Sequence, residues 1–537
     1  MTEEIPQNPP APVASYRVEQ AVAVLTIDSP PVNALGHRVR LAIAEGVERA
    51  LADGGVQALV LVCAGRTFFA GADVSELGKP ILPPLLGDII ALFEASPKPV
   101  VAAMHGTALG GGFELALAAH FRVAVAAAAV GLPEVALGLL PGAGGTQRVP
   151  RLVGVRAAVE MIGLGRQVKA PEALELGLID AIVADDALVE GAVAFARAQV
   201  AAGARLRRLR DLPTDMGGQE AQAVFAAFRA AHPDLFIGFK AAEGVLQAIE
   251  AAATLPFDAG LARERALSQA LTASPESAAQ RHLFFAARAA ARLPGSEKLR
   301  AAPAEAVAVI GPWAGAAGLR AAGVAVADAV LPGRPALLGT GARPEAAEGA
   351  SCLIHTEGAA TLPADAIGLM LHAGVAEIVV GQEASPATAV TAMALAQQAG
   401  WPAIYVRPAP GLVVARLAGR LQAAMAALAQ QGIRPADIAA SGRAFGFAAA
   451  LLPAAEGAGT ASAQIEQALV WPVLAEAWAL IDEGVALRAA DVDFAMVRAG
   501  LWPAWKGGPA YMAAEIGRAA LAPWRATDAA PATGVDA

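Results

Sequence analysis

Short, continuously apolar runs alternate with helical patterns through residues 16–200, and this alternation restricts the possible folds more than any other feature of the sequence. The strand candidates are residues 21–27, 58–64, 99–106 and 121–126. A fully apolar run such as ALVLVCA, residues 58–64, is typical of a strand buried on both faces. Apolar residues recur every fourth position from Val39 to Leu51, which predicts an amphipathic helix. Strands separated by helices pair in parallel through crossover connections, so we expect an α/β fold here.

Composition excludes several classes of protein. Of the 537 residues, 56% are hydrophobic and only 17% are charged, the reverse of a disordered chain. The net charge of −9 argues against nucleic acid as a partner, because such binding needs a basic surface. The two cysteines, Cys63 and Cys352, cannot form a disulfide framework and fit a reducing compartment.

No segment has the pattern of a membrane span or of a targeting signal. The most apolar region, residues 100–145, is interrupted by charged residues, glycines and prolines, so we expect no membrane association. The first residues, MTEEIPQNPPAPV, lack the basic and apolar parts of a secretory signal, and the final GVDA is not a peroxisomal address. Together with the cysteine content, these features predict a cytoplasmic protein.

Changes of pattern divide the whole chain into seven parts. We predict a flexible tail (1–15), an α/β core (16–200), a helical region with a linker helix (201–298), a truncated α/β segment (299–385), two helical domains (386–456 and 457–524) and a second tail (525–537). The basic run 205–210, RLRRLR, is either a phosphate site or a solvated helix face, and we favour the solvated face.

The densest chemical signal is ALGGGFE, Ala108–Glu114. Consecutive glycines let a backbone approach a ligand closely, and a helix beginning near Phe113 adds free N–H groups that bind developing negative charge. Glu114 would lie in the first helical turn, and Glu134 follows Pro133 in another turn. Two carboxylates beside one anion site suit acid–base catalysis. The alternative is a tight packing turn with two surface glutamates.

A second glycine-containing segment, FFAGADVSEL, spans residues 68–77 after a predicted strand. Its backbone could supply another donor for negative charge, although on its own it indicates only a strand-to-helix turn.

Taken together, these segments resemble the enoyl-CoA hydratase/isomerase (crotonase) family. The matching residues, in the family's order, are 30–35 (PPVNAL), 68–77, 97–117, 132–154 and 170–183. The resemblance implies a crotonase core, a ββα spiral, at residues 16–200. It also implies an oxyanion hole made by the backbone amides of Ala72 and Gly111. Glu114 and Glu134 would be the catalytic carboxylates.

The family's chemistry is the addition of water to a trans-2-enoyl-CoA, which gives a 3-hydroxyacyl-CoA. Because both glutamates are kept, the resemblance favours hydration, with Glu114 chiefly activating water and Glu134 chiefly delivering a proton. Glu134 acting alone would give Δ3,Δ2-enoyl-CoA isomerisation. No metal or cofactor is required, since coenzyme A is part of the substrate. Weaker candidates for substrate binding are Arg66, Gly71, Asp73, Lys79 and Gly110.

The rest of the chain resembles the multifunctional β-oxidation enzyme, type 1. Residues 257–295 resemble its linker, whose helix packs back onto the hydratase domain; a plain interdomain helix is the alternative. Residues 402–421 and 479–512 resemble its two C-terminal helical repeats. Members of that family are usually monomeric, whereas isolated crotonases form trimers and hexamers, so the sequence leaves the assembly open. Other β-oxidation enzymes are possible partners.

In that family an NAD-binding dehydrogenase domain lies between the linker and the repeats, but here its pattern is degenerate. Residues 307–311, VAVIG, match the first strand, yet Trp313 stands where the fingerprint needs its second glycine. The segment is also too short to complete a doubly wound dinucleotide fold. We therefore expect no NAD binding.

The dehydrogenase's catalytic positions are also altered. Glu377 matches the family's catalytic glutamate, but the HFF segment with its histidine is missing, and His372 is either a remnant or a packing residue. HTEG at 355–358 replaces the expected SNTS, and Ala415 replaces an asparagine. The prediction is a hydratase with an inactive dehydrogenase half. The rivals are a bifunctional hydratase/dehydrogenase and a non-catalytic acyl-CoA-binding scaffold subunit.

Overall fold

The computed structural model divides the chain into two compact units, Met1–Ser277 and Ala278–Ala537. It describes residues 12–525 except 74, 75, 77, 78, 297, 341, 343, 344, 346, 347, 349, 357–361 and 373. The two predicted tails therefore lie largely outside the described residues, although the first strand already begins at Ala14. No helix within the described ranges is long and apolar enough to cross a membrane.

The first unit is built on a six-stranded sheet with the order β1-β2-β3-β4-β6-β9. The strands are β1 (Ala14–Glu19), β2 (Val22–Ile27), β3 (Ala58–Cys63), β4 (Val100–Met104), β6 (Phe121–Val125) and β9 (Ala181–Val183). β1 pairs with β2 in antiparallel fashion, and every other neighbouring pair is parallel. The four strands predicted from the sequence, and their parallel pairing, are confirmed.

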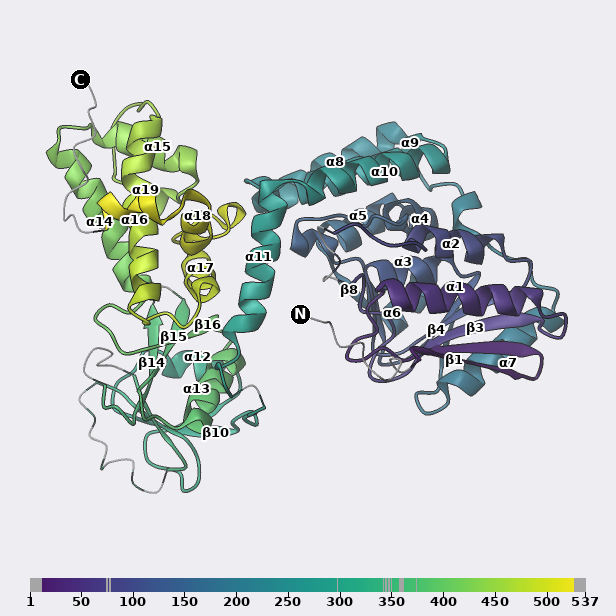
Figure 1. Ribbon diagram of the computed structural model, residues 1–537, viewed down its shortest axis with the longest axis horizontal. Coiled ribbons are helices and arrows are strands. Elements are labelled where there is room, and N and C mark those ends of the chain that lie inside the picture. The colour runs from purple at the N-terminus through teal and green to yellow at the C-terminus, as the bar shows by residue number, and fades with distance from the viewer. Residues whose placement is uncertain are drawn as a thin grey trace, which may run out of the picture. The chain divides into compact units, whose positions relative to one another are not determined.

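Helices cover both faces of this sheet, which explains why its strands are apolar throughout. On β3, Leu59 and Leu61 pack in one core with α1 (His37–Ala52), whereas Val60 and Val62 pack in another core with α7 (Leu188–Ala201). Alternate residues of a strand point to opposite faces, so each helix takes every second side chain. α1 and α7 lie on opposite faces of the sheet in Figure 1.

A second, three-stranded sheet lies in the same unit and leads into the candidate site. Its strands are β5 (Thr107–Leu109), β7 (Ala129–Gly131) and β8 (Gln167–Lys169). The helices around it are α2 (Leu86–Ala95), α3 (Gly111–Ala118), the 3-10 helix η2 (Glu134–Leu137), α4 (Gly145–Val153), α5 (Val155–Gly163) and α6 (Ala170–Glu175). β5 ends at Leu109 and α3 begins at Gly111, so the strand positions the glycine-rich start of the helix.

Three further helices complete the first unit. They are α8 (Gly218–Ala231), α9 (Ala241–Thr254) and α10 (Phe257–Thr272), with short 3-10 turns η3 (Leu209–Asp211) and η4 (Pro233–Phe236). Leu246 and Ile249 of α9 and Leu271 of α10 belong to the same hydrophobic core as Leu140 and Val149. α8, α9 and α10 run side by side in Figure 1. The first part of the predicted linker is thus an integral part of this unit.

The second unit contains a seven-stranded sheet with the order β11-β10-β12-β13-β14-β15-β16. Its strands are β10 (Ala306–Ile310), β11 (Ala325–Ala327), β12 (Ala336–Leu338), β13 (Leu353–His355), β14 (Ile367–His372), β15 (Val375–Val380) and β16 (Ala403–Val406). All pairs are parallel except β14 with β15. The helices α12 (Ala316–Ala321) and α13 (Pro386–Gln398) accompany it. The sheet continues past the predicted boundary at residue 385.

The remaining helices of the second unit share one hydrophobic core. They are α11 (Pro275–Ala290), which contains the boundary between the units, α14 (Val414–Gln430), α15 (Pro435–Phe445), α16 (Ala463–Asp482), α17 (Ala489–Arg498), α18 (Pro509–Ile516) and α19 (Arg518–Leu521), with 3-10 turns η6 (Ala449–Leu451), η7 (Ala504–Lys506) and η8 (Ala522–Trp524). Leu417 and Leu421 of α14 pack in the same cluster as Leu469 and Leu474 of α16. The two helical domains expected from the sequence therefore bury their apolar side chains together.

Candidate active site

Two of the three glycines at the start of α3, Gly110 and Gly112, meet different steric demands. Gly110 has φ 54° and ψ −132°, a conformation that a residue with a side chain rarely adopts. A Cβ atom on Gly112 would overlap the carbonyl oxygen of Phe69. The backbone of residue 69 therefore crosses directly over the helix start, and this close approach is possible only because Gly112 has no side chain.

Backbone hydrogen bonds fix the segment that carries Ala72. Phe69 accepts a hydrogen bond from the Leu109 amide at 3.0 Å, and Gly71 accepts one from the Leu35 amide at 2.9 Å. The segment is thereby held between the end of β5 and the residues that precede α1. This arrangement gives Ala72 a defined position next to α3.

A buried asparagine supports the same segment. Asn33 adopts φ 52° and donates from its side chain to the carbonyl oxygens of Ala64 and Thr67, at 2.9 and 2.8 Å. Asn33 belongs to the PPVNAL segment, but its role as a clamp for a distant loop was not predicted. Its partners lie 31 and 34 residues further along the chain, beyond the reach of a local pattern.

The amide nitrogen of Ala72 lies close to Gly111. A Cβ atom built on Gly111 would stand 3.7 Å from the Ala72 nitrogen. Neither amide donates to an acceptor among the residues that the structure describes. Leu86 and Leu35 border the same position, so two free N–H groups lie close together next to apolar side chains. Such a pair can bind a developing oxyanion.

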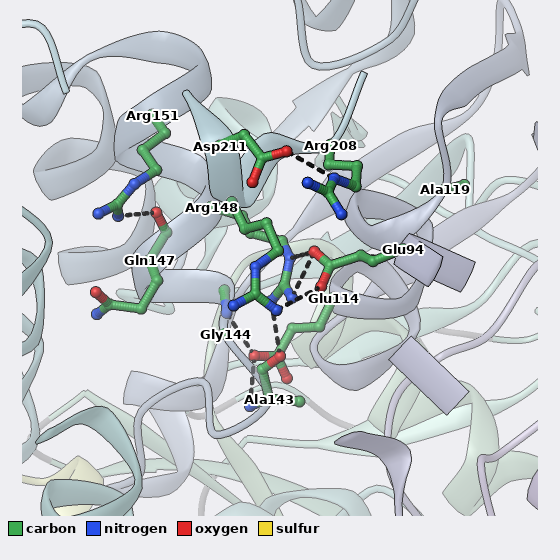
Figure 2. Close-up of polar contacts among 12 residues, drawn as sticks. Glu94, Glu114, Ala119, Ala143, Gly144, Gln147, Arg148, Arg151, Arg208 and Asp211 are labelled. Atoms are coloured by element: carbon green, nitrogen blue, oxygen red, sulfur yellow. Dashed lines mark hydrogen bonds and ion pairs between the residues drawn. The ribbon is translucent and has the colours of Figure 1, made fainter. Parts of the chain in front are cut away.

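Glu114 projects from the first turn of α3 and is buried. Its Oε1 atom accepts hydrogen bonds from the amides of Ala143 and Gly145, both at 2.8 Å. Figure 2 shows Glu114 next to Ala143. Burial raises the pKa of Glu114, whereas the two amides and the nearby Arg148 guanidinium lower it. The carboxylate form is therefore supported by specific donors in an otherwise dry site.

Glu134 opens the 3-10 turn η2 and lies against the same helix start. Its Oε1 atom would be 2.9 Å from a Cβ atom on Gly110. Although the residue as a whole is half-buried, its Oε2 atom is buried and has no hydrogen-bond partner in the described structure. Burial raises the pKa of Glu134 well above its ordinary value, and the charges of Glu114 and Glu264 raise it further. Burial thus raises the pKa of both predicted carboxylates, but only Glu114 has amide donors and an arginine that offset this effect.

A third buried carboxylate, Glu264 of α10, was not predicted. It accepts hydrogen bonds from the amides of Gly144, at 2.7 Å, and Thr146, at 3.1 Å, and from the Thr146 hydroxyl. Burial, followed by the charge of Glu114, raises its pKa to about 8. Helical spacing offered a signal, because Glu264 lies on the buried face of α10 with Gly260 and Leu271.

Arg148 of α4 is the buried cation of the site. Its Nη2 atom lies 2.8 Å from Oε1 of Glu94, and its Nη1 atom donates to the Ala143 carbonyl at 3.0 Å (Figure 2). Both side chains of this ion pair are almost fully buried. This pair, also missed from the sequence, fastens the residue whose amide donates to Glu114.

The weaker candidates for substrate binding differ in their surroundings. Arg66 and Lys79 are exposed and have no carboxylate partner among the described residues. Gly71, with φ 125°, and Gly110 shape turns. Asp73 is packed against Gly36 at the start of α1, where a Cβ atom would stand 2.9 Å from its Oδ2 atom.

The basic run 205–210 is mostly neutralised by carboxylates. Arg207 pairs with Asp180, Arg208 with Asp211, and Arg210 with Asp258. These pairs favour the structural interpretation over a phosphate site. In the described part of the chain, no group of three or more His, Cys, Asp or Glu side chains is arranged to hold a metal ion.

The glycine-rich turn after β10 is filled by the protein's own indole rings. A Cβ atom on Gly315 would overlap the ring of Trp313, and one on Gly318 would meet the ring of Trp401 at 2.5 Å. The two rings pack edge to face with centroids 5.9 Å apart. Because a dinucleotide needs bare glycine backbone next to its pyrophosphate, these residues do not fit NAD.

The other altered dehydrogenase positions lie around the start of α14. Glu377 is fully buried, and its Oε1 atom accepts hydrogen bonds from the amides of Val413 at 2.9 Å and Val414 at 3.4 Å. His372 Nε2 lies 3.3 Å from Glu377 Oε2, but without the geometry of a hydrogen bond. Ala415 follows in the first turn of α14. Glu377 therefore caps the start of α14. In the segment 355–358, residues 357 and 358 lie outside the described residues.

A mainly parallel sheet covered by helices on both faces, with a glycine-rich helix start next to Glu114 and Glu134, defines a protein of the crotonase class. The family model for enoyl-CoA hydratase/isomerase matches residues 17–236. A probable enoyl-CoA hydratase of Bacillus subtilis (strain 168) is 43% identical over 190 residues, which cover 34% of this chain and 74% of that protein. The chain belongs to the enoyl-CoA hydratase/isomerase family.

Longer relatives match as well. The peroxisomal bifunctional enzyme of Danio rerio is 44% identical over 273 residues, which cover 51% of this chain. The chain spans only 38% of the length of that relative. Among solved structures, enoyl-CoA hydratase subunit I of Geobacillus kaustophilus HTA426 aligns at 30% identity with a TM-score of 0.33, over 51% of this chain and 95% of the other.

Proposed function

We propose that the first unit adds water to a trans-2-enoyl-CoA and so forms a 3-hydroxyacyl-CoA. The observation that carries this proposal is the convergence of the free amides of Ala72 and Gly111 beside Glu114 and Glu134. Two amides alone would suit many reactions of thioesters. Two buried carboxylates beside them can also supply the base and the acid that hydration needs.

The amides would act on the thioester carbonyl. When water attacks C3 of a 2-enoyl thioester, the electrons of the double bond move toward the carbonyl oxygen, which becomes an enolate oxyanion. The N–H groups of Ala72 and Gly111 would stabilise that charge. Losing one such donor typically costs about 10²–10³-fold in rate.

The surroundings of the two carboxylates suggest their division of labour. Glu114 has two amide donors and Arg148 to support its anionic form, so it would accept the proton of the attacking water. Glu134 has an unpartnered oxygen and faces the charge of Glu114, so it would remain protonated and deliver its proton to C2. An O–H bond of water, the O–H bond of Glu134 and the carbon–carbon π bond break, while the C3–O and C2–H bonds and an O–H bond on Glu114 form. Exchange with solvent restores both carboxyl groups.

For the second unit we propose a role in packing without dehydrogenase activity. Trp313 and Trp401 occupy the turn where a dinucleotide would lie, and Glu377 is engaged in capping α14. On this proposal coenzyme A enters only as part of the substrate, and neither NAD nor a metal is needed. We also propose a cytoplasmic location, which is supported by the free state of Cys63 and Cys352.

The decisive experiment follows the enone absorbance of crotonoyl-CoA, and of enoyl-CoAs of increasing chain length, on addition of the full chain. We expect the absorbance to fall and chromatography to identify the 3-hydroxyacyl-CoA. Conversion of a 3-enoyl-CoA without hydration would instead indicate an isomerase. Binding of acyl-CoA with neither reaction would indicate a scaffold. Reduction of added NAD, with oxidation of the 3-hydroxyacyl-CoA to a 3-oxoacyl-CoA, would indicate the bifunctional enzyme.

A further inference from the structure

One short turn, residues 143–146, is shared by two buried carboxylates. The amides of Ala143 and Gly145 donate to Oε1 of Glu114 at 2.8 Å. The amides of Gly144 and Thr146 donate to Glu264 at 2.7 and 3.1 Å. Successive N–H groups therefore alternate between a carboxylate of α3 and a carboxylate of α10.

The Thr146 side chain strengthens the contact with Glu264. Its hydroxyl group lies 2.5 Å from Oε2 of Glu264 and also accepts a hydrogen bond from Gln147 Nε2 at 2.9 Å. Gln147 Nε2 donates in addition to the Ala248 carbonyl of α9, at 2.9 Å. Glu264 is fully buried, so these groups, rather than water, satisfy its oxygens. The turn is thus fastened to α9 and α10 on the side opposite Glu114.

The charged groups around Glu264 are few. The charge of Glu114 raises the pKa of Glu264 and that of Arg148 lowers it, and the charge of Glu264 in turn raises the pKa of Glu134. On the helices that pack against α10, Glu243 of α9 forms an ion pair with Arg229, and Arg151 of α4 donates a hydrogen bond to the Gln147 carbonyl. On α10 itself, Arg263 donates to Gln247. Glu264 therefore responds mainly to the carboxylates of the candidate site and to Arg148.

We propose that Glu264 is a positioning residue for Glu114. By holding the amides of Gly144 and Thr146, it orients the turn so that the amides of Ala143 and Gly145 remain directed at the Glu114 carboxylate. This inference rests on the proposed hydratase function, in which Glu114 is the base. It assigns a part in the reaction to a residue of α10, which lies beyond the segment matched by the family model, residues 17–236.

The expected pH effect has a definite sign. The Ala143 and Gly145 amides lower the pKa of Glu114, so a loosened turn lets that pKa rise. The acidic limb of the kcat–pH profile, which reports loss of the base by protonation, then moves to higher pH. Removing the negative charge of Glu264 would, by itself, lower the pKa of Glu114. However, the Glu264 pKa of about 8 leaves this residue mostly protonated across the acidic limb, so this opposing effect is small there.

Hydrogen exchange tests the geometry without relying on turnover. In Glu264→Gln, residue-resolved exchange should accelerate at Gly144 and Thr146, which lose good acceptors, and also at Ala143 and Gly145, whose acceptor is unchanged. Thr146→Val, which keeps the shape and the amide but removes the hydroxyl, should give a smaller change of the same pattern. Thr146→Ser should behave like the wild type. Unchanged exchange at Ala143 and Gly145 in both Glu264→Gln and Thr146→Val would overturn the proposal.

Kinetics supply the second readout. For Glu264→Gln we expect kcat to fall by about 10- to 100-fold, as misplacement of a catalytic group does, with KM unchanged and the acidic limb moved to higher pH. Asp493→Asn is the matched control, because Asp493 is a buried carboxylate of the second unit that accepts the amides of Ala510 at 2.7 Å and Tyr511 at 3.1 Å. It should lower thermal stability and leave the pH profile unchanged.

The two proposals fail in different ways. A wild-type chain that does not hydrate enoyl-CoA would refute the proposed function, while the exchange experiment would still report on the turn. A wild-type hydratase whose Glu264→Gln variant loses thermal stability but keeps its kcat and its acidic limb would show that Glu264 is only a structural brace. If Glu264→Gln does not fold, Thr146→Val is judged by the same criteria.

Discussion

The amide nitrogen of Ala72 lies 3.7 Å from the position that a Cβ atom of Gly111 would occupy, although the two residues belong to separate segments. A methyl group at residue 111 would therefore stand in the space where the thioester oxygen is proposed to bind. It would also come within 3.0 Å of Leu86 Cδ2. The proposed site therefore requires glycine at residue 111 as well as the two amides.

Replacing Gly111 by Ala should reduce kcat for crotonoyl-CoA hydration by about 10²–10³-fold, because the methyl group would keep the thioester oxygen away from the two amides, an effect comparable to losing one oxyanion donor. Thermal unfolding should change little, because a helical residue accepts alanine readily. The control is Gly419→Ala in α14, where a Cβ atom meets nothing within 4 Å. Full activity of Gly111→Ala would show that the oxyanion binds elsewhere.

Glu114→Gln and Glu134→Gln should each lower kcat by about 10²–10⁴-fold, the usual contribution of a general acid or base. Glu134→Gln should not lower the melting temperature at neutral pH, since burial already makes the neutral form of Glu134 the favoured one. Steady-state hydration and calorimetry measure the two effects. A variant that hydrates normally would remove its residue from the mechanism.

Glu377→Gln should flatten the pH dependence of stability in the second unit. Burial raises the pKa of Glu377 from 4.5 to about 7. The folded state therefore holds a proton that the unfolded chain releases near pH 4.5, so stability is lost as the pH rises from 4.5 to 7. At 1.36 kcal/mol per pKa unit, the loss amounts to roughly 3 kcal/mol.

Denaturant unfolding between pH 4.5 and 8 measures this effect. The wild type should weaken over the range, whereas Glu377→Gln, which keeps an oxygen for the Val413 amide, should weaken less. Parallel curves for the two proteins would assign the pH dependence to other groups.

Titration of NAD into the full chain should give no saturable heat, because the indoles of Trp313 and Trp401 occupy the turn after β10. The Trp313→Ala variant tests whether the indole ring only blocks a dinucleotide site or whether the site itself has been lost. Binding that appears only in this variant would show that the ring alone blocks a surviving site. Saturable binding to the unaltered protein would overturn the proposed inactivity of the second unit.

Local pattern was sufficient for the four central strands of the six-stranded sheet, whereas β1, β5, β7, β8 and β9 were not predicted. The runs that became β2, β3, β4 and β6 are apolar throughout because they are buried on both faces, and this leaves an unmistakable signature in the sequence. β16 (Ala403–Val406) was missed, since its four residues lie within a region whose periodicity is otherwise helical. A strand this short is specified by its partner β15 rather than by its own sequence.

The residues of the candidate site that could be predicted are those that lie in motifs of the family. Ala72, Gly111, Glu114 and Glu134 lie in motifs that carry a strong family resemblance. Glu264 was missed because its hydrogen-bond partners lie 118 and 120 residues away, and because its own helix is rich in charge. Such long-range contacts are set by the packing of α10 onto α4 and α9, which no local pattern encodes.

The position of Glu264 late in the first unit has a consequence for synthesis on the ribosome. The sheet, the oxyanion amides and both proposed catalytic carboxylates have emerged well before α10, which ends at Thr272. Until that helix leaves the exit tunnel, the turn at 143–146 lacks half of its acceptors. A nascent chain arrested before α10 has emerged should therefore already contain both oxyanion amides and both proposed catalytic carboxylates, and we expect full activity to appear only when translation has passed α10.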